Sequence, residues 1–120
     1  MSQTVMIVDD ALFMRKILSG MLVNMGFTVV AEAASGIEAM KNLHRLHPDL
    51  IMLDIILPDS NGLDLLKSIL QTSPNSKVVV CSGIGQEDVM QRAVDLGASG
   101  FIQKPFTPEK IIAVLENLGA

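Results

Sequence analysis

Hydrophobic residues in this chain alternate between short uninterrupted runs and longer stretches in which they recur every three or four positions. A short run is typical of a buried strand, and the wider spacing is typical of an amphipathic helix. The runs predict strands at residues 5–8, 27–31, 50–53, 78–81 and 101–102. The spaced stretches predict helices within residues 14–25, 35–43, 63–70, 86–96 and 107–118. The pattern therefore predicts five strand–helix pairs.

Residues that favour helix ends stand at the boundaries of these predicted helices. Ser35 and Glu38 have the spacing of a capping box, in which both side chains accept hydrogen bonds from backbone N–H groups at a helix start. Gly26 and Gly97 directly follow helical stretches, where a residue without a Cβ is favoured. Thr107 is the predicted N-cap of the last helix, with a proline at the first helical position.

Strands that alternate with helices favour an α/β fold in which helices cover both faces of a parallel sheet. Such strands are buried on both sides, which explains runs of Val, Ile and Leu without alternating polar residues. Right-handed crossover connections then favour an open, doubly wound sheet. The connections leave no room for a linker, so we expect a single domain over residues 1–120.

Composition narrows the class of protein. Hydrophobic residues make up 49% of the 120 positions, but no run approaches the ~20 apolar residues that a membrane helix needs. Charged residues between Asp9 and Lys16 interrupt any apolar region of a secretory signal. The single cysteine cannot form an internal disulfide and fits a reducing cytosol, so we expect a cytoplasmic protein. Nine basic and thirteen acidic residues give a net charge of −4, which disfavours nucleic acid as a partner.

Polar residues follow four of the predicted strands at their carboxyl ends. Asp9 and Asp10 follow the first strand, Asp54 the third, Ser82 the fourth and Lys104 the fifth. Ligands of doubly wound sheets bind at this edge, so these side chains are predicted to converge there. Each residue alone has an ordinary explanation, because Asp10 could cap the following helix and an isolated Asp or Ser is common in loops.

Together, the three carboxylates point to a cation. They repel one another unless a positive charge or a raised pKa compensates. Mg²⁺ fits this need because it binds one or two carboxylates and keeps several waters. A carboxylate can also attack phosphorus, and the oxygens of the transferred phosphoryl group are then stabilised by a metal ion, an ammonium and a hydroxyl. Asp54 lies between the acidic pair and the side with Ser82 and Lys104, so it is the predicted nucleophile.

The sequence resembles the response-regulator receiver domains of two-component signalling. The resemblance covers essentially the whole chain, in order and at the family's spacing. The matching segments are residues 6–10, 53–58, 61–62, 81–83 and 101–106. It implies a flavodoxin-like doubly wound (βα)5 fold, with a five-stranded parallel sheet in the strand order 2-1-3-4-5.

The resemblance also implies roles for the residues at the strand ends. Asp54 is the phosphoacceptor, which receives its phosphoryl group from a phosphohistidine. Mg²⁺ is bound directly by Asp10, Asp54 and the backbone carbonyl of Ile56, and through water by Asp9.

On the other side of the expected site, the resemblance implies that Lys104 pairs with the phosphoryl group and Ser82 donates a hydrogen bond to it. The peptide bond between Lys104 and Pro105 is expected to be cis. Ser82 and Phe101 are the expected switch residues, because movement of the hydroxyl leaves space that the aromatic ring can fill. This chain has Phe101 where many relatives have Tyr, so any coupling rests on packing alone; alternatively, the ring only covers the core.

Two isoleucines bear on the lifetime of the phosphorylated state. Ile56 and Ile84 lie two residues after the phosphoacceptor and after Ser82, at positions where receivers vary their rates of dephosphorylation. Neither side chain can orient a water molecule or act as a base. We therefore expect slow self-dephosphorylation, and a separate phosphatase where signalling is fast.

The resemblance includes features of the chemotaxis branch of the family, at residues 11–15 and 104–106. It implies a monomeric single-domain regulator rather than an enzyme with turnover. Its partners would be a chemotaxis-type sensor histidine kinase and a downstream target such as a flagellar switch protein. The start at Met1 and the end just after the last helix favour a complete protein; a phosphorelay intermediate and an excised receiver of a larger regulator are the alternatives.

A different class, the aspartyl-phosphate phosphohydrolases of the haloacid-dehalogenase type, also uses a strand-end Asp with Mg²⁺. That family has a second acid two residues after the nucleophile, where this chain has Ile56, and usually a cap region for which this chain has no room. A Rossmann nucleotide-binding enzyme is disfavoured because residues 9–13 contain no glycine.

Overall fold

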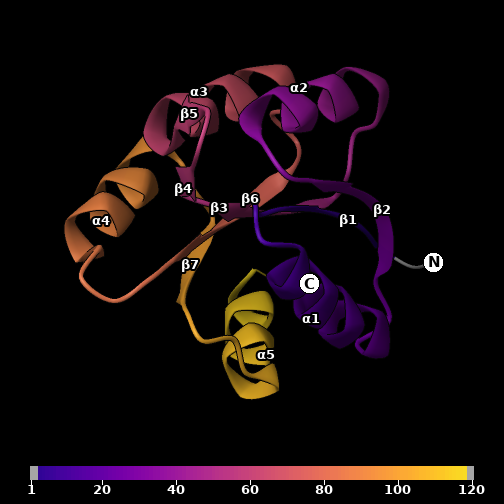
Figure 1. Cartoon of the computed structure of the whole chain (residues 1–120). Coiled ribbons are helices and arrows are strands. Elements are labelled where there is room, and N and C mark those ends of the chain that lie inside the picture. Colours follow the sequence, from indigo (N-terminus) through magenta and orange to yellow (C-terminus); the bar gives the residue numbers. More distant parts are fainter. Residues whose placement is uncertain (1–2, 119–120) are drawn as a thin grey trace.

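The five long strands of the chain form one parallel sheet (Figure 1). The computed structural model describes residues 3–118. The strands of the sheet are β1 (Thr4–Val8), β2 (Thr28–Ala33), β3 (Leu50–Asp54), β6 (Lys77–Ser82) and β7 (Gly100–Gln103). They lie in the order β2-β1-β3-β6-β7, and every neighbouring pair is parallel. Counted along these five strands the order is 2-1-3-4-5, which confirms the predicted doubly wound fold.

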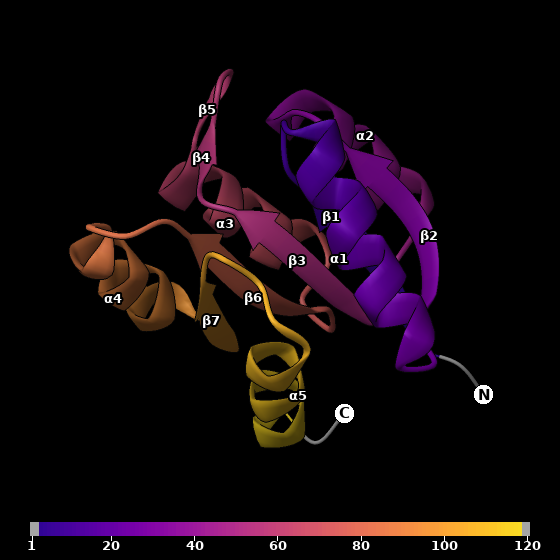
Figure 2. The same cartoon turned by 60° about the horizontal axis from the view of Figure 1, so that its bottom comes forward.

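Helices cover both faces of this sheet (Figures 1 and 2). The helices are α1 (Leu12–Asn24), α2 (Gly36–Arg45), α3 (Gly62–Thr72), α4 (Glu87–Leu96) and α5 (Pro108–Asn117). One hydrophobic cluster joins the sheet to α2, α3 and α4, and a second joins the other face to α1 and α5. Within residues 3–118, no helix combines the length and the apolar character needed to cross a bilayer.

The central strand β3 shows why the hydrophobic runs lack alternating polar residues. Ile51 and Leu53 belong to the first cluster, and Leu50 and Met52 belong to the second. All four side chains are at most 2% exposed, as expected for a strand covered by helices on both sides. The strand is therefore held firmly from both faces, and it carries Asp54 at its carboxyl end.

Most predicted helix signals are confirmed. Ser35 Oγ accepts a hydrogen bond from the Glu38 N–H, and a Glu38 carboxylate oxygen accepts one from the Ala34 N–H, at 3.2 and 2.8 Å. Thr107 Oγ1 accepts one from the N–H of Lys110 at 3.2 Å. The second strand was predicted two residues too short, because pairing with β1 continues through residues 32 and 33 despite the charge at position 32.

The sequence pattern did not predict the small hairpin that follows β3. Its strands, β4 (Ile56–Leu57) and β5 (Ser60–Asn61), pair antiparallel and project beyond the carboxyl edge of the sheet (Figure 2). At its tip, Asp59 accepts hydrogen bonds from the backbone N–H groups of Gly36 and Ile37, at 2.9 and 3.2 Å. The hairpin is thereby fastened to the start of α2, and it extends the sheet edge next to Asp54.

Candidate functional site

Four of the predicted site residues lie at the carboxyl edge of the sheet. Asp9 directly follows β1, Asp54 ends β3, Ser82 ends β6 and Lys104 directly follows β7. Asp9, Asp54 and Ser82 are 3%, 6% and 0% exposed. The edge lies where the strand order reverses between β1 and β3, which is where open α/β sheets bind ligands. The structure thus brings together side chains from distant parts of the chain.

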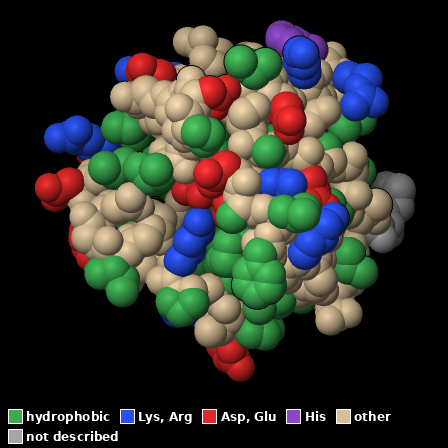
Figure 3. Space-filling view, in the orientation of Figure 1, with side chains coloured by type: hydrophobic (Ala, Val, Ile, Leu, Met, Phe, Trp, Pro, Cys, Tyr) green, Lys and Arg blue, Asp and Glu red, His purple; other side chains and the backbone are tan. Residues whose placement is uncertain are grey.

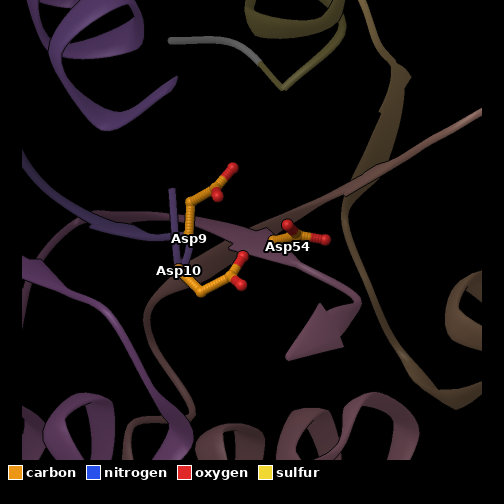
Figure 4. Close-up of side chains that lie close together, drawn as sticks. All are labelled: Asp9, Asp10 and Asp54. Atoms are coloured by element: carbon orange, nitrogen blue, oxygen red, sulfur yellow. The ribbon is translucent and has the colours of Figure 1, made fainter. Parts of the chain in front are cut away.

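Three carboxylates meet at this edge (Figure 4). Asp9, Asp10 and Asp54 each offer a carboxylate oxygen, and these oxygens lie within 4.8 Å of one another. The alternative in which Asp10 caps the following helix is wrong, because the N-cap residue of α1 is Ala11 and no side-chain hydrogen bond caps the helix there. Instead, Asp9 Oδ1 accepts a hydrogen bond from the Ala11 N–H at 2.9 Å. The Asp10 side chain is exposed and is left facing the other two carboxylates.

Lys104 supplies positive charge to this cluster. Its Nζ lies 3.1 Å from Asp9 Oδ2 and 3.0 Å from Asp54 Oδ2, so a single ammonium bridges two buried carboxylates. The carboxylates of Asp9, Asp10 and Asp54 outnumber this ammonium. Oxygen ligands with excess negative charge suit a hard divalent cation. The cluster therefore fits Mg²⁺ in its donor chemistry as well as in its position.

Burial and hydrogen bonding act in opposite directions on the charges here. Burial raises the pKa of Asp54, and the Ile56 N–H at 3.0 Å and the Lys104 ammonium only partly oppose it. Burial lowers the pKa of Lys104, but its bonds to Asp54 and Asp9 outweigh that effect and raise the pKa overall. The ammonium is thus held charged, and the Asp54 carboxylate carries a desolvation cost.

Arg15 was missed by sequence reasoning. Its Nη1 donates a hydrogen bond to the backbone carbonyl of Asp9 at 2.7 Å, and its Nε pairs with Glu32 at 3.2 Å. Arg15 therefore fastens the loop that carries the acidic pair to the neighbouring strand β2. The only signal in the sequence was a basic residue within two turns of Asp9 and Asp10, which does not indicate its partner.

The β6 side of the site is arranged differently. Ser82 Oγ donates a hydrogen bond to the thioether sulfur of Met90, and the Gly83 N–H donates one to Gln86 Oε1 at 2.7 Å. Both acceptors belong to the beginning of α4, and neither was predicted as a site residue. An open pocket of about 380 Å³ lies beside these groups. It is lined by Asp10, Asp54, Ile56, Leu57, Pro58, Gly83, Gln86 and Lys104.

Three of the remaining predicted residues lie at the surface, and one of them, Ile56, lines this pocket. The side chains of Ile56, Ile84 and Phe101 are 54%, 85% and 47% exposed. Phe101 belongs to neither hydrophobic cluster among the described residues, and its role as a switch residue or as a cover for the core stays a prediction. The Lys104–Pro105 peptide bond is cis. In Figure 3, acidic side chains lie near the middle of the visible face, next to basic side chains and with hydrophobic side chains on several sides.

Comparison with known proteins assigns the chain to a family. The family model described as the response regulator receiver domain matches residues 5–116. The chain is 40% identical to the chemotaxis protein CheY of Thermotoga maritima, over 98% of both chains. It is 37% identical to that of Bacillus subtilis, again over 98% of both.

Solved structures agree with this assignment. The CheY of the CheX–CheY–BeF3–Mg²⁺ complex from Borrelia burgdorferi superimposes with a TM-score of 0.88 at 30% identity, covering 98% of this chain and 90% of that one. The chemotaxis response regulator CheY4 of Vibrio cholerae gives 0.87 at 25% identity, covering 98% and 99%. The chain therefore belongs to the response-regulator receiver family of two-component signalling.

Proposed function

We propose that this protein is a phosphorylation-controlled regulator that accepts a phosphoryl group on Asp54. The observation that carries this proposal is the position of the Asp54 carboxylate. It lines an open pocket, lies 3.0 Å from the Lys104 ammonium and belongs to a cluster of three carboxylates. A nucleophile, a positive charge and a set of oxygen ligands are the parts that phosphoryl transfer requires.

The residues present fit a Mg²⁺ ion in this cluster. Asp10, Asp54 and the backbone carbonyl of Ile56 would hold it directly, and Asp9 would act through a water molecule. These residues line the pocket or belong to the carboxylate cluster, which supports the assignment. When bound, Mg²⁺ would neutralise charge on the phosphoryl oxygens during transfer.

The transfer itself uses groups of this chain. An oxygen of Asp54 forms the bond to phosphorus while the bond from phosphorus to the imidazole nitrogen of the donor phosphohistidine breaks, and that nitrogen keeps the electron pair. The Lys104 ammonium already contacts Asp54, so it lies where it can stabilise the negative charge of the phosphoryl oxygens. Ser82 and the Gly83 N–H stand on the β6 side as donors for the phosphoryl oxygens, once they release their present partners.

Phosphorylation then changes a surface for a partner. Movement of Ser82 toward the phosphoryl group would free space beside β7, and Phe101 would turn into it from its half-exposed position. The affected surface comprises α4, β7 and α5. Phenylalanine has no hydroxyl to bond in the inward position, so the coupling depends on packing alone.

The phosphorylated state is expected to decay slowly. Ile56 and Ile84 flank the site with exposed side chains that offer no polar atom to an attacking water. We therefore expect no enzymatic turnover and a need for a separate phosphatase where fast responses are required. Decay of the isolated phosphoprotein within a few seconds at neutral pH with Mg²⁺ would contradict this expectation.

The relatives support a role in chemotaxis or motility. Those named above are chemotaxis proteins, and one solved relative is bound to CheX, beryllium fluoride and Mg²⁺. The corresponding partners for this chain would be a chemotaxis-type histidine kinase and a downstream target such as a flagellar switch protein, with the chain acting as a monomer.

Incubation with acetyl phosphate and Mg²⁺, followed by intact-mass measurement, tests the proposal. We expect one added phosphoryl group, no addition when EDTA removes the metal, and no addition to an Asp54→Asn variant. Asp64→Asn is the matched control, because Asp64 is exposed on α3 outside the carboxylate cluster. Equal labelling of Asp54→Asn and the parent would rule out Asp54 as the phosphoacceptor.

A further inference from the structure

Both donors on the β6 side of the site already have acceptors in the first turn of α4. Ser82 Oγ donates to Met90 and the Gly83 N–H donates to Gln86. The two acceptors are four residues apart, so they lie on the same side of the helix. The start of α4 thus occupies the donors that a phosphoryl group would need.

The bond made by Gln86 is not an ordinary helix cap. Gln86 is the N-cap residue of α4, where a side chain usually accepts a hydrogen bond from an N–H of the following turn. The Gln86 side chain makes no such bond. Its carboxamide oxygen instead accepts a hydrogen bond from the Gly83 N–H at 2.7 Å. The side chain therefore makes a contact at the edge of the pocket rather than capping α4.

The position of this bond makes it a competitor for a ligand. Gly83 and Gln86 line the same pocket as Asp54 and Lys104. A phosphoryl oxygen on Asp54 is anionic and forms a stronger hydrogen bond with a backbone N–H than a neutral carboxamide does. The carboxamide oxygen therefore stands in for the phosphoryl oxygen until the phosphoryl group arrives.

We propose that Gln86 is a positioning residue that occupies the Gly83 N–H in the resting state and must release it when Asp54 is phosphorylated. This inference rests on the proposed function, because it concerns the same phosphoryl group. Release of Gln86 frees its carboxamide at the N-cap of α4, so the start of this helix takes part directly in the response. Part of the free energy of phosphoryl binding is then used to break the Gly83–Gln86 bond.

Beryllium fluoride with Mg²⁺ tests this competition, because it imitates a phosphoryl group on a carboxylate without covalent transfer. A Gln86→Leu variant keeps the approximate size of the side chain and removes the acceptor. Its affinity for beryllium fluoride is expected to rise about two- to tenfold, the net contribution of one neutral hydrogen bond. Gln86→Glu is expected to bind more weakly than the parent, because its carboxylate is a better acceptor and repels the anion.

Gln91→Leu is the matched control. Gln91 is an exposed glutamine of the same helix, and its side-chain amide donates a hydrogen bond to Asp95 Oδ1 at 3.0 Å. Its loss is expected to leave the affinity for beryllium fluoride unchanged. Mg²⁺ affinity without fluoride should match that of the parent in Gln86→Leu and Gln91→Leu, since neither change alters a charge or a carboxylate of the cluster.

Amide resonances provide a readout that a purely structural role would not move. In the resting state, the Gly83 N–H resonance of Gln86→Leu is expected to shift upfield from that of the parent, because its acceptor is gone. With beryllium fluoride bound the two resonances should coincide. If the parent binds beryllium fluoride and Gln86→Leu binds it with the same affinity, the inference about Gln86 is wrong and the proposed function is unaffected. A parent that binds no beryllium fluoride would overturn the proposed function and the inference together.

Discussion

The two halves of the site are prepared for ligand to different degrees. On the side of β1, β3 and β7, Lys104 already pairs with Asp9 and Asp54 at 3.1 and 3.0 Å. On the side of β6 and α4, Ser82 and Gly83 donate their hydrogen bonds to α4 residues. The first half holds its charged groups where the chemistry needs them. The second half must exchange partners before it can contribute.

The difference follows from the kind of bond on each side. The Lys104 side chain is 25% exposed, but it contacts two buried carboxylates that would lose their compensating charge if it moved away, so the charged half stays fixed. A neutral hydrogen bond contributes only about 0.5–1.5 kcal/mol net and can be exchanged readily. A response to phosphorylation is therefore expected in the half that is held by neutral bonds, next to the helix that belongs to the proposed partner surface.

The largest effect is expected from removing the Lys104 ammonium, on the side of β1, β3 and β7. Lys104→Ala should lower the rate of labelling by acetyl phosphate about 100-fold or more, the usual loss when a preorganised charge stabiliser is removed. The same change should raise the affinity for Mg²⁺, because it removes a positive charge that contacts two carboxylates. Partial unfolding would weaken both labelling and Mg²⁺ binding, so slower labelling together with tighter Mg²⁺ binding cannot arise from it.

Lys41→Ala is the control for this variant, since Lys41 is an exposed lysine of α2 outside the site. It should match the parent in both measurements. A Lys104→Ala protein that is labelled at the parent rate would show that the ammonium is not part of the transfer step.

The next effect concerns stability and its pH dependence. The pKa of Asp54 is raised above its ordinary value of 3.8 by burial. The stability that its protonated form provides is therefore fully present below pH 3.8 and is lost as the pH rises through the raised pKa. At neutral pH the charged carboxylate is a cost, so Asp54→Asn should stabilise the metal-free protein by roughly 0.5–2 kcal/mol.

Urea unfolding of both proteins between pH 4 and pH 7, with EDTA, measures this difference. The stability advantage of Asp54→Asn should be small at pH 4 and should grow as the pH rises. An advantage that shrinks with rising pH would mean that the ion pair with Lys104 outweighs burial at this carboxylate.

A smaller effect is expected at the loop that carries the acidic pair. Arg15→Leu removes the donor to the Asp9 carbonyl and should weaken Mg²⁺ binding several-fold while lowering stability by about 1 kcal/mol. Lys16→Leu is a close control, because Lys16 pairs with the same Glu32 at 3.1 Å without contacting Asp9. Calorimetric Mg²⁺ titration of the two variants separates the bond to the Asp9 carbonyl from the pairing with Glu32. An equal loss of Mg²⁺ affinity in both variants would trace the effect to Glu32.

The sequence contained enough information for the fold and for one half of the site. Uninterrupted apolar runs identify strands that are buried on both sides, and the residues directly after them meet because parallel strands end at one edge. Asp54 and Lys104 could therefore be placed together although they lie 50 residues apart. Ionic groups at strand ends are visible in a sequence because the residue type itself indicates the chemistry.

The other half could not be predicted in the same way. The bonds of Gln86 and Met90 depend on how the loop after β6 enters α4, and neither residue type indicates such a contact. The β4–β5 hairpin was missed for a similar reason, since strands of two residues carry no periodic pattern. Its position depends on the hydrogen bonds that Asp59 at its tip accepts from Gly36 and Ile37 at the start of α2, which lie 23 and 22 residues away along the chain.

The smallest effect is expected at Met90. Met90→Leu keeps the side-chain volume, so the free energy of unfolding should change by less than about 1.5 kcal/mol. It removes the sulfur acceptor of Ser82, and the affinity for beryllium fluoride should rise about two- to fivefold. Met40→Leu on α2 is the control, because Met40 packs against the hydrophobic cluster away from the site. An equal rise in both variants would assign the effect to core packing rather than to the Ser82 bond.

Combining Met90→Leu with Gln86→Leu then shows whether α4 releases its two bonds separately. Independent bonds would make the two gains in affinity multiply, because free energies of uncoupled sites add. A helix start that moves as one unit loses both bonds in the same step, so the first substitution would already loosen the second contact. The double variant would then gain less than the product of the single gains, and the shortfall would measure the coupling between Ser82 and Gly83 through the first turn of α4.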